Sequence, residues 1–290
     1  MDVALASCLS LPEPDHDETP LRAALGEAGL SCAVLAWDDP AADWSAARLT
    51  VLHTTWNYHR HPQAFLAWVE ATARVSDLWN RPAAVQWNFH KGYLLDLGLH
   101  GISVAPTELV PQGSDRRLVD VMAARGWDAV VVKPAISASS YRTKRLGEDS
   151  LAEGESHLRA LLTAGDALVQ RYLPSVESYG ERVLVWIDGE LTHAVRKSPR
   201  FEGDKESSSA ALPIAPAEAE LATAALARAT TVLGEPPMYA RIDLAPGPEG
   251  EPVLMELELI EPSLYFPQSP EALARFVTAI SARLAASRRS

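Results

Sequence analysis

The sequence has little of what marks secreted, membrane or nucleic-acid-binding proteins. Its two cysteines, Cys8 and Cys32, cannot form a disulfide framework, so we expect a reduced chain in the cytoplasm. No apolar run approaches the roughly 20 residues of a membrane span, and the first residues lack the positive charge of a secretory signal. The 26 Lys and Arg residues are outnumbered by 38 Asp and Glu residues, which gives a net charge of −12. This balance argues against nucleic acid as the main partner but allows a local basic pocket for a small phosphate ligand.

The common short motifs for nucleotides and zinc are also missing. The chain has no GxxxxGKS/T loop, no GxGxxG after a strand, and no HExxH or close spacing among its 8 histidines. A zinc site is therefore not expected, and a nucleotide site would have to be built in another way.

Strand-like and helix-like runs alternate in the first third of the chain, which predicts a small parallel sheet with helices on its faces. The expected strands and helices are residues 3–6, 21–28, 32–37, 49–53 and 65–75. The pattern breaks near Asn80, so we expect an N-terminal α/β domain over residues 1–80.

Two further domains are expected, a central one over residues 81–172 and a C-terminal one over residues 173–290. Both are predicted to be α+β, built mainly on antiparallel strands and helices. The expected elements are a helix over 87–97, a helix over 115–125, strand 129–133, helix 151–162, strand 167–172, a hairpin over 182–195, helix 218–233, a hairpin over 238–260 and a helix from 270 towards 287. A polar loop over 200–209 is expected to be an ordinary surface loop, with a lid as the alternative.

The hairpin over residues 238–260 is the most informative segment. Alternation places Arg241 and Asp243 on one face of its first strand, and Glu256 and Glu258 on one face of its second. The opposite, apolar face of the second strand is expected to carry Met255, Leu257 and Leu259. Packing the apolar faces together sets Asp243 beside Glu256 and Arg241 beside Glu258. Neighbouring carboxylates repel each other, and Mg²⁺ with phosphate oxygens would relieve that repulsion. A solvated outer face is the alternative.

Two other segments carry polar groups suited to a nucleotide. Lys133 ends an apolar strand and precedes a loop of small residues, where an ammonium, hydroxyls and backbone N–H groups would suit a phosphate. A lysine that merely extends its charge into solvent is the alternative. Gln170 and Glu177 bracket the end of the next strand and could meet a purine edge and a ribose, although on its own the stretch is explained better as an ordinary inter-domain linker.

Taken in order, these motifs resemble the ATP-grasp superfamily of ligases over residues 80–265. The resemblance implies an ATP-grasp fold with three domains and ATP clasped between the central and C-terminal ones. The residues that it implies for ATP are Lys91, Lys133, Ser137, Ser139, Ser140, Gln170, Tyr172, Leu173 and Glu177. Mg²⁺ would be held by Asp243, Glu256 and Glu258, and the transferred phosphate would face Arg241, Lys197 and Arg196.

The chain departs from the family pattern at two places. The phosphate loop is usually rich in glycine, whereas residues 135–140 contain none, so its individual contacts stay open. The third metal position is often Asn, whereas here it is Glu258, and the added charge favours a second metal ion.

A finer resemblance is to the O-ureido-serine cyclo-ligases of cycloserine biosynthesis, an antibiotic pathway. The segments that carry it are residues 7–17, 54–58, 87–94, 133–137 and 255–264. It implies that ATP activates the carboxylate of O-ureido-D-serine as an acyl phosphate, which an internal nitrogen then attacks to give D-cycloserine. The implied partner is a small amino-acid-like substrate, and a homodimer is allowed.

Substrate residues are expected near the N-terminal domain. The candidates are Asp15, Asp17, Trp56, Tyr58, Glu261 and Ser263. Two alternatives stay open. A role at a helix N-terminus is the preferred explanation for Asp15 and Asp17, and Trp56 and Tyr58 can equally be core residues.

Two rival functions remain at this stage. One is an intermolecular ligase that joins a carboxylate to the amine of another amino acid or peptide. The other is a non-enzymatic ATP-binding module, against which the full charge set of Arg241, Asp243, Glu256 and Glu258 argues.

Overall fold

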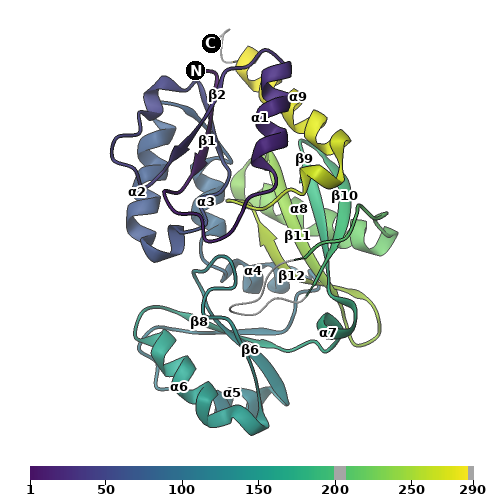
Figure 1. Cartoon of the computed structure of the whole chain (residues 1–290). Helices are drawn as coiled ribbons and strands as arrows, with labels where there is room; N and C mark the ends of the chain where they lie inside the picture. Colours follow the sequence, from purple (N-terminus) through teal and green to yellow (C-terminus); the bar gives the residue numbers. More distant parts are fainter. Residues whose placement is uncertain (199–206, 287–290) are drawn as a thin grey trace.

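Three four-stranded sheets form the framework of the part of the chain that the computed structural model describes, residues 1–198 and 207–286 (Figure 1). Each sheet comes from a separate stretch of the sequence. In Figure 1 the sheets formed within residues 3–79 (the first) and 181–258 (the third) occupy the upper part of the molecule. The sheet formed within residues 107–171 (the second) lies below them. The loop predicted over residues 200–209 lies mostly outside the described residues.

The first sheet is parallel, as predicted, and it is covered on both faces. Its order is β2-β1-β3-β4, with bounds β1 (Val3–Ser7), β2 (Cys32–Ala36), β3 (Leu49–Leu52) and β4 (Asp77–Trp79). Along β1 the side chains alternate. Val3 and Leu5 pack in one core with helices α1 (Glu18–Glu27) and α9 (Pro270–Ala286). Ala4 and Ala6 pack in another with α2 (Pro62–Ala73), where their small size leaves room for aromatic rings.

The second sheet is antiparallel and has one apolar and one functional face. Its order is β5-β8-β6-β7, with bounds β5 (Thr107–Val110), β6 (Ala129–Pro134), β7 (Lys144–Gly147) and β8 (Ala167–Arg171). Val130 and Val132 of β6 pack in one core with α5 (Leu118–Arg125) and α6 (Leu151–Leu162). Val131 and Lys133 point the other way and line a cavity.

The third sheet is antiparallel and combines core and site. Its order is β10-β9-β11-β12, with bounds β9 (Glu181–Ile187), β10 (Glu190–Lys197), β11 (Tyr239–Pro246) and β12 (Pro252–Glu258). One face packs on three helices, α3 (Pro82–Asn88), α4 (Tyr93–Leu99) and α8 (Pro216–Leu233). The other face is apolar where Val185 and Tyr239 meet the core of the first sheet, and charged where Arg241 and Asp243 line the cavity.

The helix predicted over residues 87–97 is wrong in one respect, because the structure breaks it into α3 and α4. Lys91 lies in the turn between them. Its backbone N–H donates to the Ala135 carbonyl at 2.8 Å instead of to the preceding helical turn, and the next N–H, that of Gly92, donates to His90 Nδ1 at 3.1 Å. The break places Lys91 at the cavity.

Side chains replace a neighbouring strand along the outer edge of β12. The Asn88 side chain accepts from the Leu259 N–H and donates to the Leu257 carbonyl, both at 2.8 Å. The Tyr93 hydroxyl accepts from the Leu257 N–H at 3.0 Å, and Asn80 Nδ2 donates to the Leu259 carbonyl at 2.8 Å. Further along, Leu254 bonds to the backbone of Ser103 and Ala105. These bonds hold in place the strand that carries Glu256 and Glu258.

Several short elements were not predicted from the sequence. Besides β4, β5 and β7, they are α7 (Ser175–Tyr179) and the 3₁₀ helices η1 (Trp44–Ala46), η2 (Tyr58–Arg60), η3 (Glu148–Ser150) and η4 (Phe266–Gln268). Among the described residues, no helix combines the length and the apolar character needed to cross a membrane.

Candidate active site

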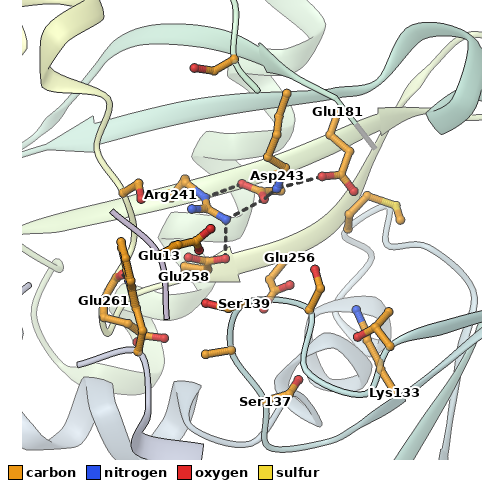
Figure 2. Close-up of a pocket in the computed structure, with 18 of the residues that line it drawn as sticks. Glu13, Lys133, Ser137, Ser139, Glu181, Arg241, Asp243, Glu256, Glu258 and Glu261 are labelled. Atoms are coloured by element: carbon orange, nitrogen blue, oxygen red, sulfur yellow. Dashed lines mark hydrogen bonds and ion pairs between the residues drawn. The ribbon is translucent and has the colours of Figure 1, made fainter. Parts of the chain in front are cut away.

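A cavity of about 1070 Å³ lies where the three sheets meet. The first sheet contributes the loops after β1 and β3, the second the end of β6 with the loop that follows, and the third the charged end of its face. Figure 2 shows Arg241, Asp243, Glu256 and Glu258 on the third sheet, above the loop that carries Ser137 and Ser139. Segments far apart in the sequence therefore share one site.

Arg241 and Asp243 form the centre of a buried ionic network. The predicted register is confirmed, because Arg241 pairs with Glu258 and Asp243 with Glu256. The Arg241 guanidinium donates to both Asp243 oxygens at 2.9 and 3.0 Å and to Glu258 Oε1 at 2.5 Å. Lys197 Nζ lies 2.8 Å from Asp243 Oδ2 and 2.9 Å from Glu181 Oε2.

The pKa values of these carboxyls follow from how many cations each one meets. Burial alone would raise the pKa of Asp243, but the charges of Arg241 and Lys197 hold it well below its usual range. Glu258 meets one guanidinium, so burial dominates and raises its pKa to about 7. Asp243 is therefore held in its ionised form, whereas the pKa of Glu258 lies near neutral pH.

Lys91 and Lys133 differ although both are buried. Lys91 is ion-paired with Glu256, and this partner outweighs burial and raises the pKa of the Lys91 ammonium. Lys133 is 9% exposed, and its ammonium makes no hydrogen bond or ion pair with any described residue. Burial lowers its pKa. Within the described part of the chain, the Lys133 side chain is therefore a buried lysine of the cavity that is paired with no carboxylate.

The carboxylates proposed as metal ligands are paired with cations. Within the described ranges, no three His, Cys, Asp or Glu side chains are gathered closely enough to hold a metal ion by themselves. Asp243, Glu256 and Glu258 are nevertheless hard oxygen donors at adjacent positions of one hairpin. This donor set suits Mg²⁺ only together with other oxygens, such as those of phosphates.

The end of the cavity near β8 is built for a flat, partly polar group. Gln170 is buried, and its Nε2 donates to Thr107 Oγ1 at 2.9 Å, which leaves its carbonyl oxygen as an acceptor. Tyr172, Leu173 and Val131 line the same cavity.

Met255 also lines this end of the cavity, although the sequence predicts that it lies on the apolar face of the hairpin. The β11–β12 register shifts between Asp243 and Leu244, which leaves Met255 without a cross-strand partner. It lines the cavity instead of packing with Leu257 and Leu259, so its predicted place on the apolar face is wrong.

Two predicted site residues are not brought into the cavity. Glu177 forms an exposed ion pair with Arg145 outside it. Arg196 is exposed and lies over the Tyr179 ring, 5.5 Å from its centroid, because it alternates with Lys197 along β10. Glu181, which sequence reasoning missed, lines the cavity and pairs with Lys197.

The loop predicted to cover the phosphates adopts an unusual backbone. Ser139, Ser140 and Arg142 have φ of 50°, 55° and 51°, the left-handed region that glycine adopts most easily. Ser137, Ser139 and Ser140 all line the cavity. The Tyr58 hydroxyl donates to the Ser137 carbonyl at 3.4 Å, so the loop also contacts the segment that follows β3.

At the other end, most of the candidate substrate residues have structural partners. The Asp17 carboxylate accepts from the N–H groups of Leu264, Tyr265 and Phe266 at 2.6–3.1 Å. Asp15 accepts from the N–H groups of Asp17 and Glu18 and lies 2.7 Å from His53 Nε2. Burial acts to raise the pKa of Asp15, but His53 and these N–H groups outweigh it and lower the pKa.

The remaining candidates form the walls of that end. Tyr58 stacks on Phe65 with ring centroids 5.1 Å apart, so it is part of the core as well as of the cavity wall. Trp56 Nε1 donates to the Glu261 carbonyl at 3.0 Å, which fixes the segment carrying Glu261 and Ser263 against the segment that follows β3. All four line the cavity.

Comparison with known proteins gives consistent results along the whole chain. A family model described as the N-terminal domain of D-cycloserine synthetase DcsG matches residues 3–80. The cycloserine biosynthesis protein DcsG of Streptomyces lavendulae is 34% identical over 293 residues, covering 97% of each chain. The crystal structure of D-cycloserine synthetase DcsG superimposes with a TM-score of 0.91 at 31% identity, over 98% of this chain and 100% of that one.

More distant structures share the fold alone. D-alanine–D-alanine ligase from Bacillus anthracis, solved with ATP, gives a TM-score of 0.67 at 13% identity, over 100% of this chain and 99% of that one. The ATP-grasp ligase PsnB gives 0.66 at 14% identity, over 97% and 98%.

Proposed function

From the premise that this chain belongs to the family of D-cycloserine synthetase DcsG, we propose that it closes the ring of D-cycloserine from O-ureido-D-serine, with ATP as co-substrate. The predicted ATP-grasp fold is confirmed by its structural neighbours. The chain is an ATP-dependent ligase.

The observation that carries the use of ATP is the buried ammonium of Lys133. An unpaired buried cation costs several kcal/mol of folding free energy, so its retention calls for an anion that arrives with a ligand. The serine-rich loop beside it and the Gln170 end of the same cavity supply groups for phosphates and for a purine. These features support ATP bound between the central and C-terminal parts of the chain.

The first step proposed is phosphoryl transfer to the substrate carboxylate. A carboxylate oxygen attacks the γ-phosphorus of ATP, the bond to the β–γ bridging oxygen breaks, and ADP leaves with its electron pair. Catalysis of this kind depends on positioning and on compensating charge. Lys133 and Arg241 would neutralise the transferred group, while Asp243 and Glu258 hold the Arg241 guanidinium in one orientation.

The second step proposed is ring closure. The ureido nitrogen bonded to oxygen attacks the acyl carbon, phosphate leaves, and the nitrogen gives up its proton. Water then releases the carbamoyl group as CO₂ and NH₃. The largely buried walls at Trp56 and Tyr58 would hold the chain of the substrate in a folded conformation suited to closure.

Mg²⁺ is proposed as the metal of this site, held by Asp243, Glu256 and Glu258 together with ATP phosphate oxygens. When bound, it would offset charge on the phosphates. Lys91, now paired with Glu256, would then be available to a phosphate.

One incubation tests the proposed function. Wild-type protein is mixed with ATP, Mg²⁺ and O-ureido-D-serine alone, and ADP, phosphate and D-cycloserine are quantified. We expect the three products in equal amounts. A strict requirement for a second amine would establish the intermolecular ligase instead. Asp243→Asn should abolish substrate-dependent ADP release, whereas Glu249→Gln, at an exposed position in the same hairpin, should leave it unchanged.

The division into residues 1–80, 81–172 and 173–290 is proposed as the functional one, with the substrate end formed largely by the first part. We also propose the cytoplasm as the location, since ATP is available there and Cys8 and Cys32 are both free thiols. The homodimer stays a prediction from the sequence.

A further inference from the structure

Glu261 is a buried carboxylate for which the fold provides no partner. The residue is 9% exposed and lines the cavity, yet its carboxylate makes no hydrogen bond or ion pair with any described residue. Its backbone is fixed, because the Glu261 carbonyl accepts the Trp56 Nε1–H at 3.0 Å. A rigid, desolvated and unpaired carboxylate is costly, and such a group calls for a cation from outside the protein.

The neighbouring charges do not neutralise it. Burial and the negative charges of Glu258 and Glu256 outweigh Lys91 and Arg241 and raise the pKa of Glu261 well above its usual range. Those two cations are already engaged, Lys91 with Glu256, and Arg241 with Asp243 and Glu258. The potential at this end of the cavity is therefore negative.

The other acidic groups nearby have partners of their own. Asp15 is paired with His53 and two backbone N–H groups, and Asp17 with three backbone N–H groups. Glu258 is paired with Arg241. Of these four carboxylates, only Glu261 keeps all its acceptor capacity for a ligand.

Position adds a second constraint. Figure 2 places Lys133 and Glu261 on opposite sides of the site, with Glu256 and Glu258 between them. Among the described residues, the cavity thus has an unpaired lysine on one side and an unpaired carboxyl group on the other. A ligand set complementary to both would carry anionic groups beside Lys133 and a cationic group beside Glu261.

We propose that Glu261 binds the α-ammonium group of the amino-acid substrate and thereby selects substrates that carry it. This proposal rests on the proposed function, in which the substrate is a zwitterion whose carboxylate must reach the phosphate end. Anchoring the ammonium at Glu261 turns the adjacent carboxylate towards Arg241 and Lys133. Trp56 and Tyr58 then enclose the rest of the substrate.

The test compares two ligands on matched variants. O-ureido-D-serine and its deaminated analogue, 3-(ureidooxy)propanoate, are titrated calorimetrically into protein saturated with a non-hydrolysable ATP analogue and Mg²⁺, and turnover is measured separately. We expect wild type to bind the ammonium ligand about 10- to 100-fold more tightly, the range for a hydrogen bond to a charged group. Glu261→Gln should reduce this preference to less than about threefold, while Glu249→Gln should keep it.

The outcomes separate the proposal from the proposed function. Binding that depends on Glu261 without cyclised product would keep this proposal and reject the cyclo-ligase. If the wild type forms cyclised product but Glu261→Gln loses affinity for both ligands by the same factor, this proposal is rejected and a role of Glu261 in proton transfer is indicated. Unchanged preference in the variant would also reject it. If Glu261→Gln does not fold, as judged by lost affinity for the ATP analogue, Glu261→Asp replaces it, with an intermediate preference expected.

Discussion

Removing the Lys133 charge should stabilise the protein and inactivate it. Lys133→Met keeps the length of the side chain and its contacts with β6, and it removes an ammonium that is 9% exposed and unpaired within the described residues. Its lowered pKa has burial as the largest cause, which indicates that desolvation outweighs the attraction of Glu256. Replacing buried charge by apolar atoms of similar volume gains about 1–3 kcal/mol.

The same substitution should remove the anchor for phosphate. Losing one preorganised group that compensates transition-state charge costs about 100- to 1000-fold in turnover. ATP at 1,000 times its Kd stabilises a binding protein by about 4.1 kcal/mol, which exceeds the gain expected from removing the charge. We therefore expect the order of stabilities to reverse, with the variant more stable without ATP and the wild type more stable with it.

Thermal denaturation with and without ATP and Mg²⁺ measures both halves of this prediction. Each kcal/mol should shift the midpoint by about 2–4 °C. Lys144→Met is the matched control, because Lys144 lies in the neighbouring strand β7 in an exposed pair with Glu153, and its loss should change stability by less than about 0.5 kcal/mol. A Lys133→Met protein that is less stable than wild type without ATP, or that turns over normally, would refute the reasoning.

Two further predictions concern residues beside the site. Burial lowers the pKa of His59 to about 4, so between pH 6.5 and pH 4 the unfolded chain binds a proton that the folded chain does not, and stability falls as the pH falls. His59→Phe keeps an aromatic ring next to Tyr141, whose ring centroid lies 4.6 Å from that of His59, and should remove this loss. In urea titrations the variant's free energy of unfolding should exceed that of wild type by about 1–2 kcal/mol more at pH 5 than at pH 8. An equal difference at both pH values would contradict the prediction. Asp17→Asn should lower the free energy of unfolding by about 1.5–3 kcal/mol, because it weakens three hydrogen bonds to a charged acceptor. The KM for substrate should stay within about twofold, and a tenfold rise would restore Asp17 as a substrate ligand.

The parts of the site that sequence predicted correctly depend on local rules. The register that brings Asp243 opposite Glu256 follows from strand alternation around a turn, and it is observed. The same rule, applied to β10, would have separated Arg196 from Lys197, since adjacent residues of a strand face opposite sides. The sequence therefore already indicates that Arg196 and Lys197 cannot both face the site.

The parts that sequence missed depend on irregularities or on tertiary contacts. A two-residue turn at Asp188 and Gly189 sets Lys197 opposite Gly180, and only the register shift between Leu191 and His193 brings it opposite Glu181. A second register shift turns Met255 into the cavity. No local pattern predicts such shifts.

Partnerships across the fold are equally hidden in the sequence. The pairing of Lys91 with Glu256 joins residues 165 positions apart, so neither segment alone indicates it. The unpaired state of Glu261 likewise depends on the three-dimensional positions of the neighbouring cations, Lys91 and Arg241, which are paired with other carboxylates.

The bonds along the outer edge of β12 have a consequence for association between chains. A sheet edge with unpaired N–H and C=O groups recruits strands from other molecules and seeds aggregates. At Leu254, Leu257 and Leu259 these groups are already taken by Ser103, Ala105, Tyr93, Asn88 and Asn80. An intruding strand would have to displace all of them at once. The strand that bears the two glutamates is thereby protected from strand addition, and the protein can keep an edge strand in its active site without exposing a template for polymerisation.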